Sequence, residues 1–218
     1  MKYKFSAIIP AGGNSSRFGN TNKLLEKIDG KEVIKYTVDA FVESNIDEII
    51  VCANISIIEE LRNIFSEYNK VKIIEGGQTR QASVFNGLKE TVCDYVLIHD
   101  GARPMISADL INLAINMVLD KKALTVATKT IDTIKEVVDG KIVKTIDRSK
   151  LYNTQTPQAF EYSLIKKAHE KLVGQNFTDD AGMLEFLGED VYILNGSYKN
   201  KKITTQNDIE VAKIYLNP

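Results

Sequence analysis

The sequence is poor in the residues that staple small proteins or hold a structural metal. Its 218 residues include no tryptophan, two cysteines, two histidines and four prolines. No Cys-x-x-Cys pair or Cys/His cluster is present, so a zinc site is not expected. Cys52 and Cys93 each lie in an apolar run, and we expect both to be buried, reduced thiols. A chain of this length buries enough surface to fold without disulfides.

The chain also lacks an excess of one charge and any long hydrophobic run. Twenty-eight basic residues face twenty-nine acidic ones, so the net charge of −1 attracts neither nucleic acid nor an anionic membrane. No apolar stretch has the length of a membrane span, and the first residues reach Pro and Gly too early for a secretory signal. We therefore expect a cytoplasmic protein with small-molecule partners, and neither nucleic acid nor a membrane among them.

Short β-branched runs alternate with helical patterns along most of the chain. In 55–68 the apolar residues fall on one helical stripe, and the pattern returns after Ser107. This alternation predicts an α/β fold, a three-layer α/β/α arrangement with a mostly parallel sheet, which binds ligands where the strand order reverses. We expect one domain over residues 1–218. The expected strands are 5–10, 48–53, 71–75, 95–99, 124–128 and 191–194.

One segment, approximately 129–158, breaks this rhythm. Asp139-Gly140 separates two β-rich runs, which is a strong hairpin signal, and we expect a β-arm that protrudes from the sheet. A lone two-stranded ribbon is marginally stable in water. The arm therefore predicts a homodimer in which it packs on a second copy.

The first expected strand runs into a Gly-rich turn, Ala11-Gly12-Gly13, with Arg17 and Lys23 just beyond it. Small residues let backbone N–H groups approach an anion closely, and the cations add charge that a simple turn does not need. We interpret the segment as a phosphate cradle, with a plain Gly-rich turn as the alternative. Its spacing fits neither GxGxxG nor a P-loop.

Further motifs follow in a fixed order. They are GGQTRQASV at 76–84, HDGARP at 99–104, Asp147-Arg148, Thr156-Pro157-Gln158, Thr178-Asp179 and Lys202-Ile203-Thr204. With the Gly-rich turn, this ordered set resembles the 2-C-methyl-D-erythritol 4-phosphate cytidylyltransferase family of the non-mevalonate isoprenoid pathway, over almost the whole chain. The resemblance implies a Rossmann-like nucleotidyltransferase that transfers CMP from CTP to the alcohol phosphate and releases pyrophosphate.

The resemblance also implies roles for individual residues. Charge accumulates on the α-phosphate during nucleotidyl transfer, so cations are needed around it. Catalytic roles fall on Arg17, Lys23 and Lys202, with Lys27 as a fallback for Lys23 because Asn22-Lys23-Leu24 departs from the family's usual Pro-Lys-Gln. Nucleotide binding falls on Pro10, Ala11, Gly12, Gly13, Gly77, Gln78 and Ser83.

Asp100 is the expected metal ligand, because it ends a hydrophobic strand and Mg²⁺ or a similar divalent cation needs few protein carboxylates beside a triphosphate. The alternative is a carboxylate that caps the following turn. Arg103 either binds substrate or orients Asp100. By resemblance, substrate binding falls on Asp100, Arg103, Thr133, Arg148, Thr156 and Thr178, with Thr133 and Arg148 reaching the neighbouring subunit's site.

Two other functions remain open from the sequence. A pentitol 5-phosphate cytidylyltransferase shares several of these motifs, although TIDRSKLY around Arg148 favours the methylerythritol enzyme. An inactive nucleotide-binding regulatory protein on the same fold is the second alternative, since a fold alone does not establish activity. We expect His99 to be a packed strand residue, and the sequence assigns no role to Arg80.

Overall fold

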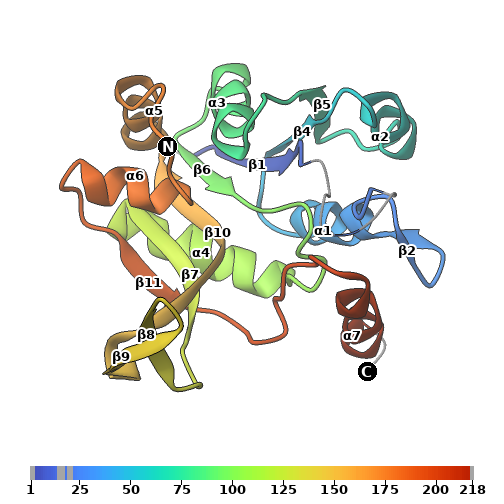
Figure 1. The fold of residues 1–218 in the computed structure, drawn as a ribbon. Helices are drawn as coiled ribbons and strands as arrows, with labels where there is room; N and C mark the ends of the chain where they lie inside the picture. The colour runs from blue at the N-terminus through green and yellow to red at the C-terminus, as the bar shows by residue number, and fades with distance from the viewer. Residues whose placement is uncertain (1–2, 14–17, 19–21, 217–218) are drawn as a thin grey trace.

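A seven-stranded sheet forms the centre of the protein (Figure 1), which a computed structural model describes over residues 3–13, 18 and 22–216. Its order is β11-β7-β10-β6-β1-β4-β5. All six strands expected from the sequence are present. Their bounds are β1 Phe5–Ala11, β4 Glu48–Ala53, β5 Val71–Glu75, β6 Tyr95–Ile98, β7 Ala123–Lys129 and β11 Tyr192–Asn195. The seventh strand, β10 Tyr152–Glu161, was not expected.

Helices cover both faces of this sheet, as predicted, because neighbouring residues of each strand point to opposite sides. Ile8 packs into a cluster with Val84 and Leu88 of α3, whereas Ala7 and Ile9 pack into the cluster on the other face. The helices are α1 Val33–Val42, α2 Ile58–Ile64, α3 Arg80–Glu90, α4 Ala108–Lys121, α5 Tyr162–Lys171, α6 Asp180–Phe186 and α7 Gln206–Leu216.

The strand order reverses beside β1. β4 and β5 continue on one side of β1, and the chain then returns to place β6 on its other side, parallel to it. The carboxyl ends of β1 and β6 therefore border the crevice in which a doubly wound sheet binds its ligands.

β10 is the main departure from the expected layout. It runs antiparallel between β6 and β7, so Tyr152–Glu161 belongs to the central sheet and the expected arm, 129–158, extends too far. The sequence pattern did not indicate this strand because several of its buried residues are polar, Gln158 among them. The hairpin itself comprises β8 Ile134–Val138 and β9 Lys141–Ile146, followed by a short 3-10 turn at Arg148–Lys150.

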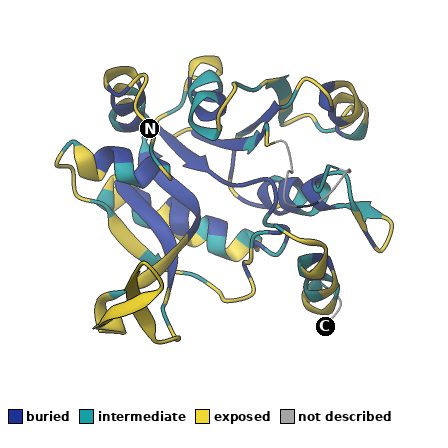
Figure 2. Cartoon of the chain, viewed as in Figure 1, coloured by how far each residue is buried: buried dark blue, intermediate teal, exposed yellow. Residues whose placement is uncertain are grey.

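The turn of this hairpin has the backbone that its sequence predicts. Asp139 and Gly140 both have positive φ, 48° and 77°, as a two-residue hairpin turn requires. Residues 131–145 are exposed throughout, including the apolar Val137, Val138, Ile142 and Val143 (Figure 2). The arm thus presents apolar surface that this chain does not cover.

Two smaller features complete the fold. The short hairpin of β2 Lys27–Ile28 and β3 Lys31–Glu32 packs near α7, where Ile28, Ile203 and Ile209 share a third apolar cluster. α2 is shorter than the helical pattern over 55–68, because the Asn54 side chain accepts the backbone N–H of Ser56 and forms a turn there.

Among the described residues no helix is both long and apolar enough to cross a membrane.

Candidate active site

A first pocket of about 180 Å³ lies at the crevice between the ends of β1 and β6. The turn after β1 supplies backbone to one wall, and the start of α3 supplies the opposite wall. Lys23 and Lys202 add two ammonium groups. The described lining residues are Pro10, Ala11, Gly12, Gly13, Lys23, Leu24, Gln78, Thr79, Arg80, Asp100, Gly101, Ala102 and Lys202.

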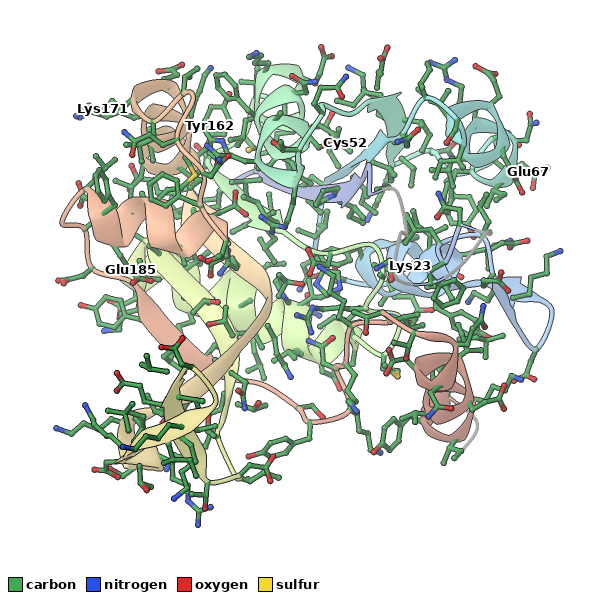
Figure 3. All side chains as sticks on the ribbon, viewed as in Figure 1. Lys23, Cys52, Glu67, Tyr162, Lys171 and Glu185 are labelled. Atoms are coloured by element: carbon green, nitrogen blue, oxygen red, sulfur yellow. The ribbon has the colours of Figure 1, made fainter. Side chains whose placement is uncertain are left out.

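A second pocket of about 420 Å³ adjoins the first and shares Arg80, Asp100 and Lys202 with it. Its remaining walls come from β10, from the turn before α6 and from α6 itself. Lys23 in the first pocket and Glu185 in the second are both labelled in Figure 3. The described residues lining only the second pocket are Arg103, Thr154, Gln155, Thr156, Thr178, Asp179, Gly182 and Glu185.

Asp100 stands where the two pockets meet, with three cations around its carboxylate. Oδ1 accepts from Nε of Arg80 at 3.1 Å, and Oδ2 lies 2.9 Å from Nζ of Lys202 and 3.4 Å from Nε of Arg103. Burial opposes ionisation, but the neighbouring positive charges outweigh it and hold the pKa of Asp100 well below its usual range. The group is a carboxylate at any physiological pH.

The backbone of Asp100 is fixed as firmly as its side chain. Its N–H donates to Oγ1 of Thr156 at 3.1 Å, and the same hydroxyl lies 3.0 Å from Nδ1 of His99. Burial lowers the pKa of His99 to about 3, so its ring is neutral at physiological pH. His99 is fully packed, as expected from the sequence, but it lies directly after β6 rather than in the strand. Its other ring nitrogen faces the carbonyl oxygen of Arg103 at 3.4 Å.

Ser83 lies between the turn after β1 and the loop before α3, the two segments at which nucleotide binding is expected. Its hydroxyl accepts the N–H of Gly77 at 3.0 Å and donates to the carbonyl oxygen of Thr79 at 2.9 Å, and its side chain is fully buried. A Cβ on Gly12 would lie 3.0 Å from this hydroxyl, so a larger residue there would crowd the contact. Gly77 and Ser83 are not among the described residues that line the first pocket, and they shape it from behind.

The lysine assignment favours Lys23 over Lys27. Lys23 lines the first pocket and donates to the carbonyl oxygen of Ile203 at 2.9 Å. Lys27 lies on the small hairpin and pairs with Glu32 at 3.3 Å. Arg17 lies outside the described residues.

Thr133 and Arg148 are separate from the pockets of their own chain. Both are exposed on the arm segment, and Arg148 donates to the carbonyl oxygen of Ile131. Neither is among the described residues that line the two pockets.

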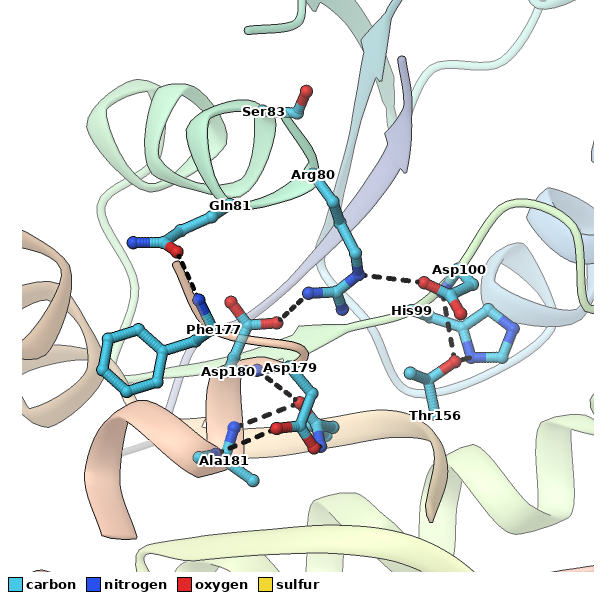
Figure 4. A network of polar contacts seen from close by, with 12 residues as sticks. Arg80, Gln81, Ser83, His99, Asp100, Thr156, Phe177, Asp179, Asp180 and Ala181 are labelled. Carbon is cyan, nitrogen blue, oxygen red and sulfur yellow. Dashed lines mark hydrogen bonds and ion pairs between the residues drawn. The ribbon is translucent and has the colours of Figure 1, made fainter. Parts of the chain in front are cut away.

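The sequence missed the partners of Arg80. This guanidinium bridges Asp100 and the buried Asp180 (Figure 4). Asp180 also forms a hydrogen bond with His169. The neighbouring Asp179 caps α6, because its Oδ1 accepts the N–H of Gly182 at 3.1 Å. No local sequence pattern distinguishes Asp180 from other helix-start carboxylates, because its partners lie on distant segments.

A mostly parallel sheet with a cation-rich pocket at its strand-order reversal, beside a Gly-rich turn, is the architecture of an α/β nucleotidyltransferase. The family model described as 2-C-methyl-D-erythritol 4-phosphate cytidylyltransferase matches residues 5–218. The chain belongs to this family.

Individual relatives agree with the family assignment. The 2-C-methyl-D-erythritol 4-phosphate cytidylyltransferase of Clostridioides difficile is 42% identical over 98% of this chain and 94% of its own. That of Bacillus pumilus is 39% identical over 98% and 97%. The crystal structure of 4-diphosphocytidyl-2C-methyl-D-erythritol synthase from Anaerococcus prevotii aligns with a TM-score of 0.89 at 35% identity, over 99% of this chain and 97% of that one.

Proposed function

We propose that this chain transfers the cytidylyl group of CTP to 2-C-methyl-D-erythritol 4-phosphate, giving 4-diphosphocytidyl-2-C-methyl-D-erythritol and pyrophosphate. The observation that carries the proposal is the junction of two pockets lined in common by Arg80, Asp100 and Lys202. The first pocket has the backbone and ammonium groups that suit a triphosphate. Threonine hydroxyls and an arginine in the second suit a phosphorylated polyol, so both substrates would meet at this junction.

The reaction joins an oxygen of the acceptor phosphate to the α-phosphorus of CTP. The bond from that phosphorus to the oxygen bridging the β-phosphate breaks, and its electron pair leaves with pyrophosphate. A phosphate monoester has a second pKa near 6, so the attacking oxygen is already deprotonated at neutral pH. Catalysis then needs positioning and charge stabilisation rather than a general base.

Lys23 and Lys202, with Arg17, supply the positive charge that offsets the charge gathering on the α-phosphate and the leaving pyrophosphate. Ser83 holds Gly77 so that the loop before α3 keeps the backbone positions that read cytosine, and Gln78 lines the same wall. Backbone of Pro10, Ala11, Gly12 and Gly13 borders the nucleotide. Arg103, Thr156 and Thr178 bind the acceptor from the second pocket.

The residues at the junction fit a magnesium ion that arrives with CTP. Mg²⁺ takes one or two protein carboxylates and completes its shell with phosphates and waters, and Asp100 supplies one carboxylate to both pockets. The described residues contain no cluster of three or more His, Cys, Asp or Glu side chains that would form a self-sufficient metal site. When bound beside Asp100, the ion would neutralise phosphate charge.

We further propose a homodimer in which Thr133 and Arg148 complete the acceptor site of the neighbouring subunit. Arg148 is exposed on the arm, and the apolar side chains of the hairpin have no cover within the described chain. A planar guanidinium suits a phosphate because it donates two parallel hydrogen bonds.

The proposal of one domain over 1–218 is supported by the apolar clusters on both faces of one sheet. A cytoplasmic location is supported by the free thiols of Cys52 and Cys93.

Pyrophosphate release, followed with a coupled assay, tests the activity. We expect turnover with CTP and 2-C-methyl-D-erythritol 4-phosphate, and much weaker turnover when UTP replaces CTP or ribitol 5-phosphate replaces the acceptor. A clear preference for ribitol 5-phosphate would assign the chain to pentitol phosphate chemistry instead. Failure to bind CTP in calorimetry would overturn the nucleotidyltransferase function as a whole.

Mixed dimers test whether the arm completes the site of its own subunit or that of the neighbouring subunit. One subunit carries Lys202→Ala and the other carries Arg148→Ala, so each is impaired as a homodimer. If the arm serves the neighbouring site, one site of the mixed dimer combines an intact Lys202 with an intact Arg148, and about half of the wild-type activity returns. If the arm serves its own subunit, both sites stay impaired and the proposed exchange is wrong.

A further inference from the structure

The side chain of Arg80 lies between two carboxylates from different parts of the fold. Arg80 begins α3, and its Nε donates to Oδ1 of Asp100 at 3.1 Å while its Nη1 donates to Oδ2 of Asp180 at 2.7 Å. Figure 4 shows the guanidinium reaching from α3 to both groups. The planar fork fixes the direction of each bond, so the position of one carboxylate constrains the other.

Asp180 lies behind Arg80 and away from the substrates. Its side chain is 1% exposed, and it is not among the described residues that line either pocket. Oδ1 accepts from Nε2 of His169 in α5 at 3.0 Å, and the backbone N–H of Asp180 donates to Gln158 at 2.9 Å. The carboxylate is held from both sides, and its influence on the site passes through Arg80.

Sharing Arg80 has an electrostatic consequence for Asp100. One guanidinium charge is divided between two buried carboxylates, and charges at this depth interact strongly. Without the charge of Asp180, the whole guanidinium would pair with Asp100 at the junction. Asp180 therefore keeps Nη1 of Arg80 away from Asp100. Asp100 then retains more of its negative charge for the groups that bind in the two pockets.

We propose that Asp180 and His169 are positioning residues that hold Arg80 and thereby set the direction and the available charge of the Asp100 carboxylate. This inference rests on the proposed cytidylyl transfer, because it assigns Asp100 to the point where the two substrates meet. Neither Asp180 nor His169 touches a reacting atom.

Asp180→Asn is the primary test, since it removes the charge and keeps the shape. The measurements are kcat, both KM values, and the affinity of the enzyme–CTP complex for Mn²⁺, titrated by electron paramagnetic resonance. We expect Mn²⁺ binding and the kcat/KM for the acceptor each to weaken by about tenfold, the size typical of coupled neighbouring groups. The KM for CTP should change by less than about twofold, because other residues bind the nucleotide.

Arg80→Lys provides a second route if Asp180→Asn does not fold. It keeps the positive charge but has no fork to engage two carboxylates, so it should weaken Mn²⁺ binding and acceptor turnover as Asp180→Asn does. His169→Gln keeps a donor where the imidazole Nε2 lies and should leave both readouts near their wild-type values. His169→Phe removes the donor and should impair them.

Thr91→Val is the matched control for a lost buried hydrogen bond. Thr91 donates to Glu48 at 2.6 Å near the amino end of the strands, far along the sheet from the pockets. It should lower the melting temperature without changing Mn²⁺ affinity. The inference would be overturned if Asp180→Asn folds and keeps its Mn²⁺ affinity and its kcat/KM for the acceptor within about twofold of wild type. It would also be overturned if Thr91→Val lost as much of both as Asp180→Asn does. Wild-type protein that binds Mn²⁺ and CTP but makes no product would count against the proposed function instead.

Discussion

The ammonium of Lys23 donates a hydrogen bond of 2.9 Å to the carbonyl oxygen of Ile203, 180 residues further along the chain. Ile203 directly follows Lys202, whose ammonium lies 2.9 Å from Asp100. The bond joins the segment after β1 to the segment before α7. Two lysines at opposite ends of the sequence are thereby brought to one pocket.

Removing either lysine should slow the chemical step. In the proposed reaction each ammonium stabilises charge on the transferred phosphate, and loss of one such donor costs about 10²-fold or more in kcat. We therefore expect this decrease for Lys23→Ala and Lys202→Ala in steady-state assays. Lys27→Ala is the matched control, because Lys27 is not among the described residues that line either pocket and pairs with Glu32 instead. A kcat within twofold of wild type would remove that lysine from the mechanism.

Arg148→Ala should act on the acceptor. Loss of a charge-assisted hydrogen bond to a phosphate costs about 1.5–3 kcal/mol, which corresponds to roughly a 10- to 100-fold higher KM for the alcohol phosphate. The KM for CTP should stay near its wild-type value. Lys150→Ala, in the same exposed turn, tests whether any lost charge has this effect. An increase in the KM for CTP alone would contradict the placement of Arg148.

His99 should make the protein less stable in mild acid. Its pKa is lowered to about 3 in the fold, so between the ordinary histidine value and pH 3 only the unfolded chain takes up this proton. Stability is then lost as pH falls through this window, with a slope of about 1.4 kcal/mol per pH unit from this group. Denaturant unfolding from pH 7 to 4 measures the slope, and His99→Asn should reduce it by that amount. An unchanged slope would show that His99 titrates normally.

Gly87→Ala should destabilise the fold although it lies within a helix. Alanine favours a helix by about 1 kcal/mol over glycine, but overpacking a core costs about 1–3 kcal/mol. A Cβ at this position would lie 2.7 Å from Cγ2 of Ile8 and 3.0 Å from Sγ of Cys52. Unfolding free energies of Gly87→Ala, Ile8→Ala and the double variant form the test, because the cavity left at Ile8 should accept the new methyl group. Additive losses would contradict this explanation.

The inner parallel strands β1, β4 and β6 were predictable because they are continuous apolar runs buried on both faces, as in Ile49–Val51. β10 was not, since Gln155, Thr156 and Gln158 are buried through specific hydrogen bonds rather than through apolarity. Polar residues in a strand are satisfied by partners that the local pattern does not reveal.

The sequence predicted which segments carry the site, and less well how their side chains pair. Asp100 and Lys202 both belong to recognisable motifs, and the position of Asp100 at the crevice follows from the strand order because it comes just after β6. Lys202 lies in the loop between β11 and α7, and its ammonium lies 2.9 Å from Asp100. The bridge from Asp100 through Arg80 to Asp180 depends on three segments and on atomic distances. No spacing along one chain encodes such a contact.

β10 begins just after the hairpin and continues through Thr156, which lines the second pocket, to Gln158 and Glu161. It pairs with β7 near both of its ends and with β6 only over Gln158–Glu161, and its register with β7 shifts between Thr154 and Gln158. A molecule that binds the hairpin is therefore connected by a single strand to the wall of the second pocket, and the residues of that strand that line the pocket, Thr154–Thr156, lie where its pairing with β7 is irregular.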